Sequence, residues 1–103
     1  MSTFICAQFH IHDRQGYARY VEMATPIFIR EGVKIHASDD APIGITQGVD
    51  FNKVVLLEFR DPAHLEHFFS TPDYAKAAKV RNAASTITAV QFERFTGLDT
   101  EAK

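Results

Sequence analysis

The stretch FICAQFHIH, residues 4–12, alternates between two kinds of side chain. Ile5, Ala7, Phe9 and Ile11 form an apolar face of the type that a strand buries. The residues between them form a second face that is unusually polar: Cys6, Gln8, His10 and His12. The alternation predicts a β-strand with the core on one side and a mixed surface on the other.

A helix is expected directly after this strand. Asp13 is a suitable N-cap, and Gly32 is placed to end the helix. Between them, apolar residues recur at helical spacing, at Tyr17, Tyr20, Val21, Ala24 and Phe28. Pro26 removes a backbone donor, so it should kink the helix or restart it.

Three more strands and a divided helix complete the chain. Strands are expected at 33–38, 53–60 and 85–95, with a long connection at 39–52. Asp61 followed by Pro62 predicts a helix start, with an apolar stripe at Leu65, Phe68 and Phe69. Pro72 begins a further helical segment that runs to about Ala84. In the third strand the two faces differ: Val55, Leu57 and Phe59 point one way, and Val54, Leu56, Glu58 and Arg60 point the other.

The order β-α-β-β-α-β is the ferredoxin-like pattern of the α+β class. It predicts an antiparallel four-stranded sheet with the first and third strands at its centre and both helices on one face. We expect a single domain at 1–97 and a short tail at 98–103. The bare sheet face is expected to pack on a second copy of the chain, which would enclose a cavity between two sheets. The alternative is a monomer in which 39–52 folds over that face.

Composition excludes several other classes of protein. The formal charge of −2 favours no binding to nucleic acid or to an anionic membrane surface. No apolar run approaches the length of a membrane span, and the first residues lack the basic region of a signal peptide. The single cysteine, Cys6, allows no internal disulfide and fits the reducing cytoplasm.

Phe4 to about Phe95 resembles a bacterial family of small proteins, the "domain of unknown function 1330" family. The resemblance is carried by the order and spacing of several elements: Ile5-Cys6-Ala7-Gln8, Asp13 with Tyr17 and Tyr20, Pro26, Gly32, Val54 to Phe59, Ser70-Thr71-Pro72-Asp73-Tyr74 and Arg81. It implies the dimeric α/β-barrel version of the ferredoxin-like fold and no settled reaction. Related barrel families include cofactor-free monooxygenases, isomerases, and dehalogenation or decarboxylation enzymes.

One segment departs from that family. After the second strand the family usually has an Arg-Gly-Gly element, whereas this chain has Ala37-Ser38-Asp39-Asp40 and a longer connection. A ligand held through that arginine would not be held in the same way here.

The candidate catalytic residues are His10 and Glu58, expected on one face of adjacent strands. A carboxylate that orients an imidazole makes a general acid–base pair near neutral pH, and the alternative is a buried pair that fixes dimer register.

The candidate ligand-binding residues are Gln8, His36, Tyr74 and Arg81. Tyr74 and Arg81 lie about two helical turns apart, so a hydroxyl and a guanidinium share one face and can hold a carboxylate. The alternative is a core tyrosine and a separately paired arginine.

Metal and nucleophile sites are not favoured. His10, His12 and His36 do not converge on predicted neighbouring strands, and His64 with His67 is expected on a solvated helix surface. Asp39, Asp40 and Asp50 match no calcium-loop spacing. Cys6 is expected to be a small packed residue.

Two functions remain open. One is a cofactor-independent enzyme acting on a small carboxylate or carbonyl compound, and the other is a non-catalytic binding or structural dimer.

Overall fold

The computed structural model describes residues 2–97, and the predicted tail at 98–103 lies outside this range. All the predicted elements are present in the predicted order. They are β1 (Thr3–Ile11), α1 (Arg14–Glu31), β2 (Lys34–Asp39), β3 (Lys53–Phe59), α2 (Pro62–Ser70), α3 (Pro72–Ala84) and β4 (Ser85–Glu93).

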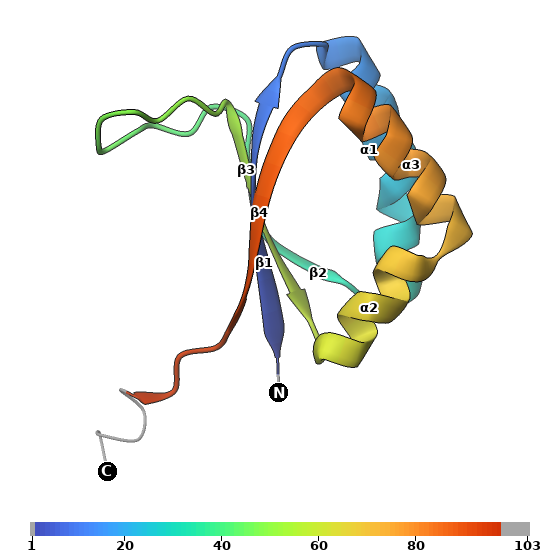
Figure 1. Ribbon diagram of the computed structural model, residues 1–103. Coiled ribbons are helices and arrows are strands. Elements are labelled where there is room, and N and C mark those ends of the chain that lie inside the picture. Colours follow the sequence, from blue (N-terminus) through green and yellow to red (C-terminus); the bar gives the residue numbers. More distant parts are fainter. Residues whose placement is uncertain (1, 98–103) are drawn as a thin grey trace.

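The four strands form one antiparallel sheet in the order β2-β3-β1-β4. The first and third strands therefore lie at the centre, as predicted. All three helices lie on one side of the sheet, as Figure 1 shows. We call the sheet face under the helices the inner face and the opposite one the outer face. The arrangement confirms the α+β ferredoxin-like fold.

Local capping explains where the helices begin and end. The Asp13 carboxylate accepts a hydrogen bond of 3.0 Å from the Gly16 amide, and Asp61 does the same for His64 at 2.8 Å. Gly32 ends α1 with a positive φ of 69°, a conformation that glycine adopts at low cost. The predicted restart at Pro26 is wrong, because α1 runs on through it. Pro26 is exposed, so the carbonyl that it leaves unpaired can bind water.

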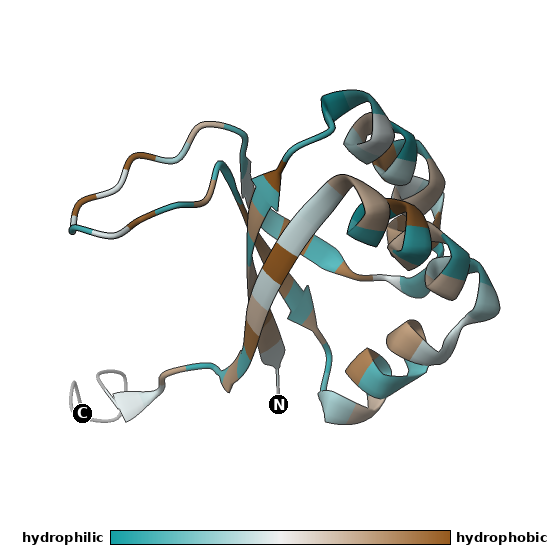
Figure 2. Cartoon of the chain, turned by 45° about the horizontal axis from the view of Figure 1, so that its top comes forward, coloured by the Kyte–Doolittle hydropathy of each residue, from teal (hydrophilic) through white to brown (hydrophobic). Residues whose placement is uncertain are grey.

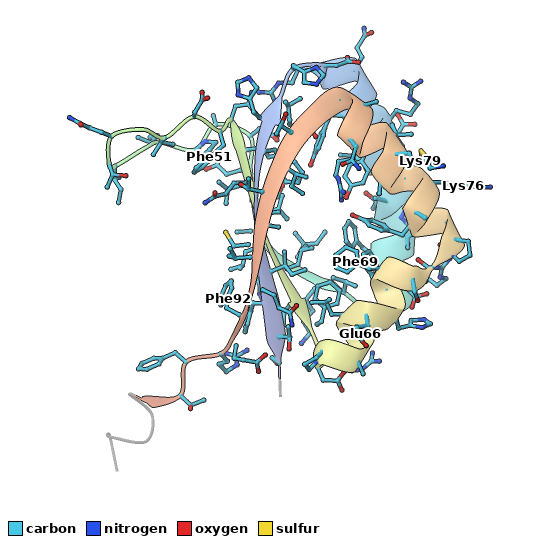
Figure 3. All side chains as sticks on the ribbon, viewed as in Figure 1. Phe51, Glu66, Phe69, Lys76, Lys79 and Phe92 are labelled. Atoms are coloured by element: carbon cyan, nitrogen blue, oxygen red, sulfur yellow. The ribbon has the colours of Figure 1, made fainter. Side chains whose placement is uncertain are left out.

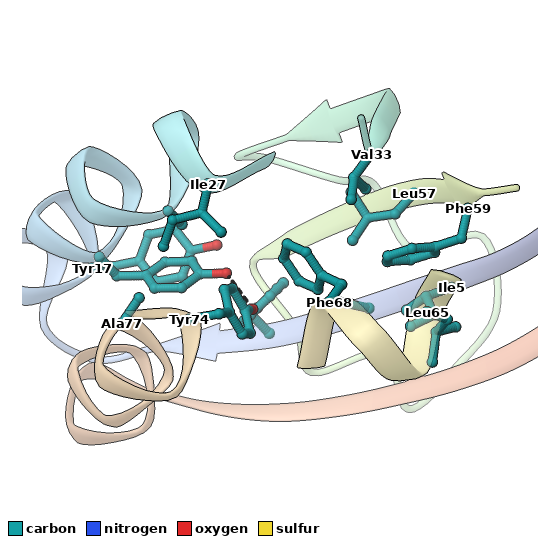
Figure 4. Packing of buried hydrophobic residues seen from close by; sticks show 14 of the residues in the cluster. Ile5, Tyr17, Ile27, Val33, Leu57, Phe59, Leu65, Phe68, Tyr74 and Ala77 are labelled. Atoms are coloured by element: carbon teal, nitrogen blue, oxygen red, sulfur yellow. Dashed lines mark hydrogen bonds between the residues drawn. The ribbon is translucent and has the colours of Figure 1, made fainter. Parts of the chain in front are cut away.

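The core is mainly aromatic and joins the helices to the inner face. Phe68 is fully buried, with its ring 5.6 Å from that of Phe59 and 4.4 Å from that of Tyr74. Figure 4 shows these rings between the helices and the sheet. The predicted α1 stripe is partly wrong, because Val21 is exposed and Ile27 is buried in its place.

His64 also differs from its expected place on a solvated surface, because its side chain is buried. Its Nδ1 accepts a hydrogen bond of 3.0 Å from the Arg60 amide, so its Nε2 carries the hydrogen and donates to the Glu31 carbonyl at 2.6 Å. The ring therefore ties the start of α2 to the end of α1.

The connection between β2 and β3 extends away from the outer face and does not fold over it (Figure 1). Apolar residues lie along it (Figure 2), and Ile43 and Ile45 are almost fully exposed. Its base is fixed, because the Asn52 side chain bonds both backbone groups of Ile11, at 2.8 and 3.0 Å. No helix within residues 2–97 is long and apolar enough to cross a membrane.

Candidate functional site

A cavity of about 710 Å³ lies between the inner face and the helices. We call it the inner cavity. Small residues that line it leave space where larger ones would pack: Ala7 and Ala89 from the sheet, and Ala18 and Ala24 from α1. A single chain forms this cavity, so it is not the one predicted between the sheets of two subunits, and that second cavity stays a prediction.

Tyrosine side chains and Arg81 form the polar wall of the inner cavity. The hydroxyls of Tyr20, from α1, and Tyr74, from α3, are 2.8 Å apart. Arg81 donates to the Tyr74 hydroxyl at 2.9 Å and lies 5.8 Å from the centre of the Tyr20 ring. Figure 4 shows Tyr17 and Tyr74 entering this space from the two helices. The predicted shared face of Tyr74 and Arg81 is confirmed.

The hydroxyl pair of Tyr20 and Tyr74 has one hydrogen left for a ligand. Tyr74 accepts from Arg81, and the two tyrosine hydroxyls share one further hydrogen bond. Whichever hydroxyl donates to the other, the second still has its own hydrogen. Burial raises the pKa of the Tyr17 and Tyr20 hydroxyls, with a smaller contribution from Tyr74, so both stay protonated at neutral pH.

Lys53 forms a second polar region of the same cavity. Its side chain is only 8% exposed, and its ammonium donates to Ser38 Oγ at 3.0 Å and to Asp40 Oδ1 at 2.6 Å. It also lies 5.5 Å from the centre of the Tyr17 ring. The hydrogen bond and charge of Lys53 hold the pKa of Asp40 below its ordinary value, so Asp40 is ionised.

The inner cavity is cationic overall. Among the described residues that line it, three basic side chains, Arg14, Lys53 and Arg81, stand against one acid, Asp40. Arg81 bonds only neutral groups within residues 2–97, namely Tyr74 and Asn82. A guanidinium without a carboxylate partner beside an apolar cavity favours an anionic or carbonyl ligand.

The other four predicted site residues lie outside this cavity. Glu58 and His36 meet on the outer face, where the His36 ring nitrogen is 2.5 Å from Glu58 Oε1. Arg94 donates to the same carboxylate at 3.2 Å and lies over the Phe4 ring. Hydrogen bonds from Ser2 and His36, and then from Arg94, lower the pKa of Glu58 to about 2 against the opposing effect of burial.

The predicted pairing of His10 with Glu58 is wrong within one chain. The strands are neighbours, but Glu58 is opposite Phe4, whereas His10 is opposite Thr86. His10 is six positions along the strand from Phe4, which is roughly 20 Å at about 3.3 Å per residue. His10 instead donates to the Asp50 carbonyl at 3.1 Å, at the base of the connection. Gln8 lies on the outer face opposite Val54 and Thr88.

The described residues contain no group of three or more His, Cys, Asp or Glu side chains that could hold a metal ion. Cys6 is half-buried on the outer face between Leu56 and Val90.

Residues 2–95 match the family described as a domain of unknown function, DUF1330. The chain belongs to the DUF1330 family. No curated protein matches it.

Solved structures similar to this DUF1330 chain share its fold at low sequence identity. A protein of unknown function from Rhodopseudomonas palustris is 18% identical with a TM-score of 0.80, over 91% of this chain and 82% of the other. SnoaB, a cofactor-independent oxygenase from Streptomyces nogalater, is 14% identical with a TM-score of 0.68, over 91% and 93%. A dimeric ferredoxin-like protein of unknown function from Thermobifida fusca is 20% identical with a TM-score of 0.67, over 91% and 92%.

Sequence reasoning missed Lys53 and Asp40 as site residues of this DUF1330 chain. Lys53 carries a signal, because it stands two residues before Val55 on the apolar side of β3. A charge at such a position points into the space under the helices. No sequence signal marks Asp40, because its position depends on where the connection leaves the sheet.

Proposed function

We propose that this chain binds a small, partly apolar carboxylate or carbonyl compound in the inner cavity and acts on it as a cofactor-independent enzyme. The observation that carries the proposal is the hydroxyl pair of Tyr20 and Tyr74 beside Arg81, in an otherwise largely apolar cavity of about 710 Å³. Apolar cavities with a few convergent polar groups are the usual form of small-molecule sites. Arg81 holds the ligand oxygen, and the free tyrosine hydrogen orients it.

Stabilisation of negative charge on a ligand oxygen is the chemistry that this wall supports. A carbonyl compound that loses an adjacent proton to a base from the solvent becomes an enolate, and hydrogen-bond donors held in fixed positions stabilise the negative charge on its oxygen. The guanidinium and the tyrosine hydroxyl are such donors. SnoaB, which has the same fold, is described as a cofactor-independent oxygenase, and this supports chemistry carried out by side chains alone.

One observation favours the second candidate, non-catalytic binding. No histidine is among the described residues that line the inner cavity, and Asp40, its one acid, is paired with Lys53. The proposed acid–base residues, His10 and Glu58, belong to the outer face. A catalytic role for either of them stays a prediction.

Ligand binding is tested by titration calorimetry with 2-naphthoate and its neutral counterpart 2-naphthamide. We expect the carboxylate to bind and Arg81→Met to weaken it roughly 10- to 100-fold, because a charge-assisted hydrogen bond contributes about 1.5–3 kcal/mol. Ala89→Phe should also weaken binding, by filling the cavity without changing its charge. Lys79→Met is the matched control, since Lys79 points outward from α3 (Figure 3). Equal binding of acid and amide, or binding that survives Arg81→Met, contradicts the proposal.

Catalysis is separated from binding by the rate at which an enolisable ketone, 2-tetralone, exchanges hydrogen for deuterium beside its carbonyl. Nuclear magnetic resonance follows this exchange directly. We expect the wild-type protein to accelerate it over buffer, and Arg81→Met to remove the acceleration. Binding of naphthoate without any acceleration of exchange would favour the non-catalytic candidate.

The functional unit is proposed to be a homodimer joined through the outer faces. Val90 and Phe92 are 62% and 42% exposed there, and Figure 3 shows Phe92 pointing away from the helices. A solved structure of the same fold is described as dimeric, which supports this assembly. We expect no nucleic-acid or membrane partner, and the cytoplasmic location expected from the single cysteine stays a prediction.

A further inference from the structure

Two cations lie beside two neighbouring, mutually tilted tyrosine rings in the inner cavity, one cation at each ring. The ring centres of Tyr17 and Tyr20 are 5.3 Å apart. Lys53 lies 5.5 Å from the Tyr17 ring and Arg81 lies 5.8 Å from the Tyr20 ring. Both cations line the same cavity, so a ligand that lies along the two rings meets a positive charge at each end.

Lys53 has the capacity to bind a ligand oxygen. Its ammonium has three donors, and two of them bond Ser38 and Asp40. A buried charge is costly unless its donors are used, which favours an occupant that takes the third. Ser38 and Asp40 also line the cavity, so the whole cluster is placed at the ligand and not behind it.

We propose that the inner cavity takes an organic acid with a second carbonyl or carboxylate group, one group held at Arg81 and the other at Lys53. This inference rests on the proposed function and deepens it, because it names a ligand with two oxygen functions at its two ends. The apolar part of such a ligand lies against the Tyr17 and Tyr20 rings. Asp40 is the modulating residue, because its charge opposes a second carboxylate at Lys53.

The test compares medium-chain α,ω-dicarboxylates of graded length with monocarboxylates of the same length, by titration calorimetry. In the wild-type protein we expect one dicarboxylate length to bind roughly tenfold or more tighter than its monocarboxylate. Lys53→Met should lower the dicarboxylate affinity roughly tenfold more than the monocarboxylate affinity, so that the gain from the second carboxylate disappears. Asp40→Asn should act in the opposite direction and tighten dicarboxylate binding, because Lys53 then loses its competing anion.

The controls separate the two proposals. Lys79→Met, on the outward side of α3, should change neither affinity. If Lys53→Met fails to fold by circular dichroism, Asp40→Asn still provides the test through the sign of its effect. If monocarboxylate binding depends on Arg81 but no dicarboxylate of any length binds more tightly, the proposed role of Lys53 is overturned and the proposed function stands. Failure of both ligand classes to bind overturns the proposed function itself.

Discussion

The candidate site residues form two sets that lie on opposite faces of the sheet. Tyr74 and Arg81 face the inner cavity, whereas Glu58 and His36 form a hydrogen-bonded cluster on the outer face. The parity of a strand residue assigns it to a face, and that much could be predicted from the alternation in β1 and β3. Which residues meet along a face depends on register, and a single sequence does not specify it.

The Glu58 cluster makes stability depend on pH in the acid range. Its pKa, about 2, is lower than the ordinary 4.5, so the carboxylate stabilises the fold above pH 4.5 and this contribution is lost as the pH falls towards 2. Glu58→Gln should therefore unfold at lower temperature than wild type at pH 7, and lose less stability between pH 4.5 and 2. Melting curves across this range, followed by circular dichroism, measure both effects.

Glu66→Gln is the control for this experiment, because Glu66 points to solvent from α2 (Figure 3). It should keep the wild-type dependence on pH. A Glu58→Gln variant with the same acid-side slope as wild type would show that the cluster does not carry the effect.

At the level of elements, the connection between β2 and β3 has a fixed base and an exposed tip. Asn52 and His10 both hold the base, through Ile11 and Asp50 respectively. His10, a candidate catalytic residue from the sequence, also contacts the connection, and its catalytic role stays a prediction. The sequence predicts the connection's bounds well, since glycine, proline and acids replace the strand pattern. It does not predict that a polar side chain ties the connection to β1.

Asn52→Ala should lower the free energy of unfolding by about 1–3 kcal/mol, because it leaves two backbone groups of Ile11 without their side-chain partner. Urea denaturation measures the loss, and hydrogen exchange at the Ile11 amide should become faster. Gln47→Ala, in the exposed part of the same connection, should change the free energy by less than about 0.5 kcal/mol. Equal effects of the two substitutions would show that the base is not held through Asn52.

On the scale of the whole molecule, the residues of the predicted apolar stripes face the space between helices and sheet, but several of them are not buried. Val21, Ile35 and Phe69 are apolar yet well exposed, and all three line the inner cavity. The pattern shows which residues face inward, but not how far apart the two layers stand. Alanines such as Ala7 and Ala24 leave space between the layers unfilled, although the sequence presents them as ordinary core residues. The sequence therefore did not predict the inner cavity, and the cavity expected between two sheets stays a prediction.

The outer face provides the test of assembly. Wild-type protein should sediment at twice the mass of one chain, because a sheet face with exposed Val90 and Phe92 is stabilised by covering it. Phe92→Asp should shift the sedimenting species to one chain, since a carboxylate buried between two apolar faces has no partner. Val90→Asp is a second variant with the same expectation, which guards against a local effect of losing the Phe4–Phe92 stack.

Ile29→Asp is the matched control, because Ile29 is equally apolar and 76% exposed but lies on α1, in the helix layer. Loss of the dimer in Ile29→Asp and its retention in both strand variants would place the interface on the helices and leave the outer face uncovered.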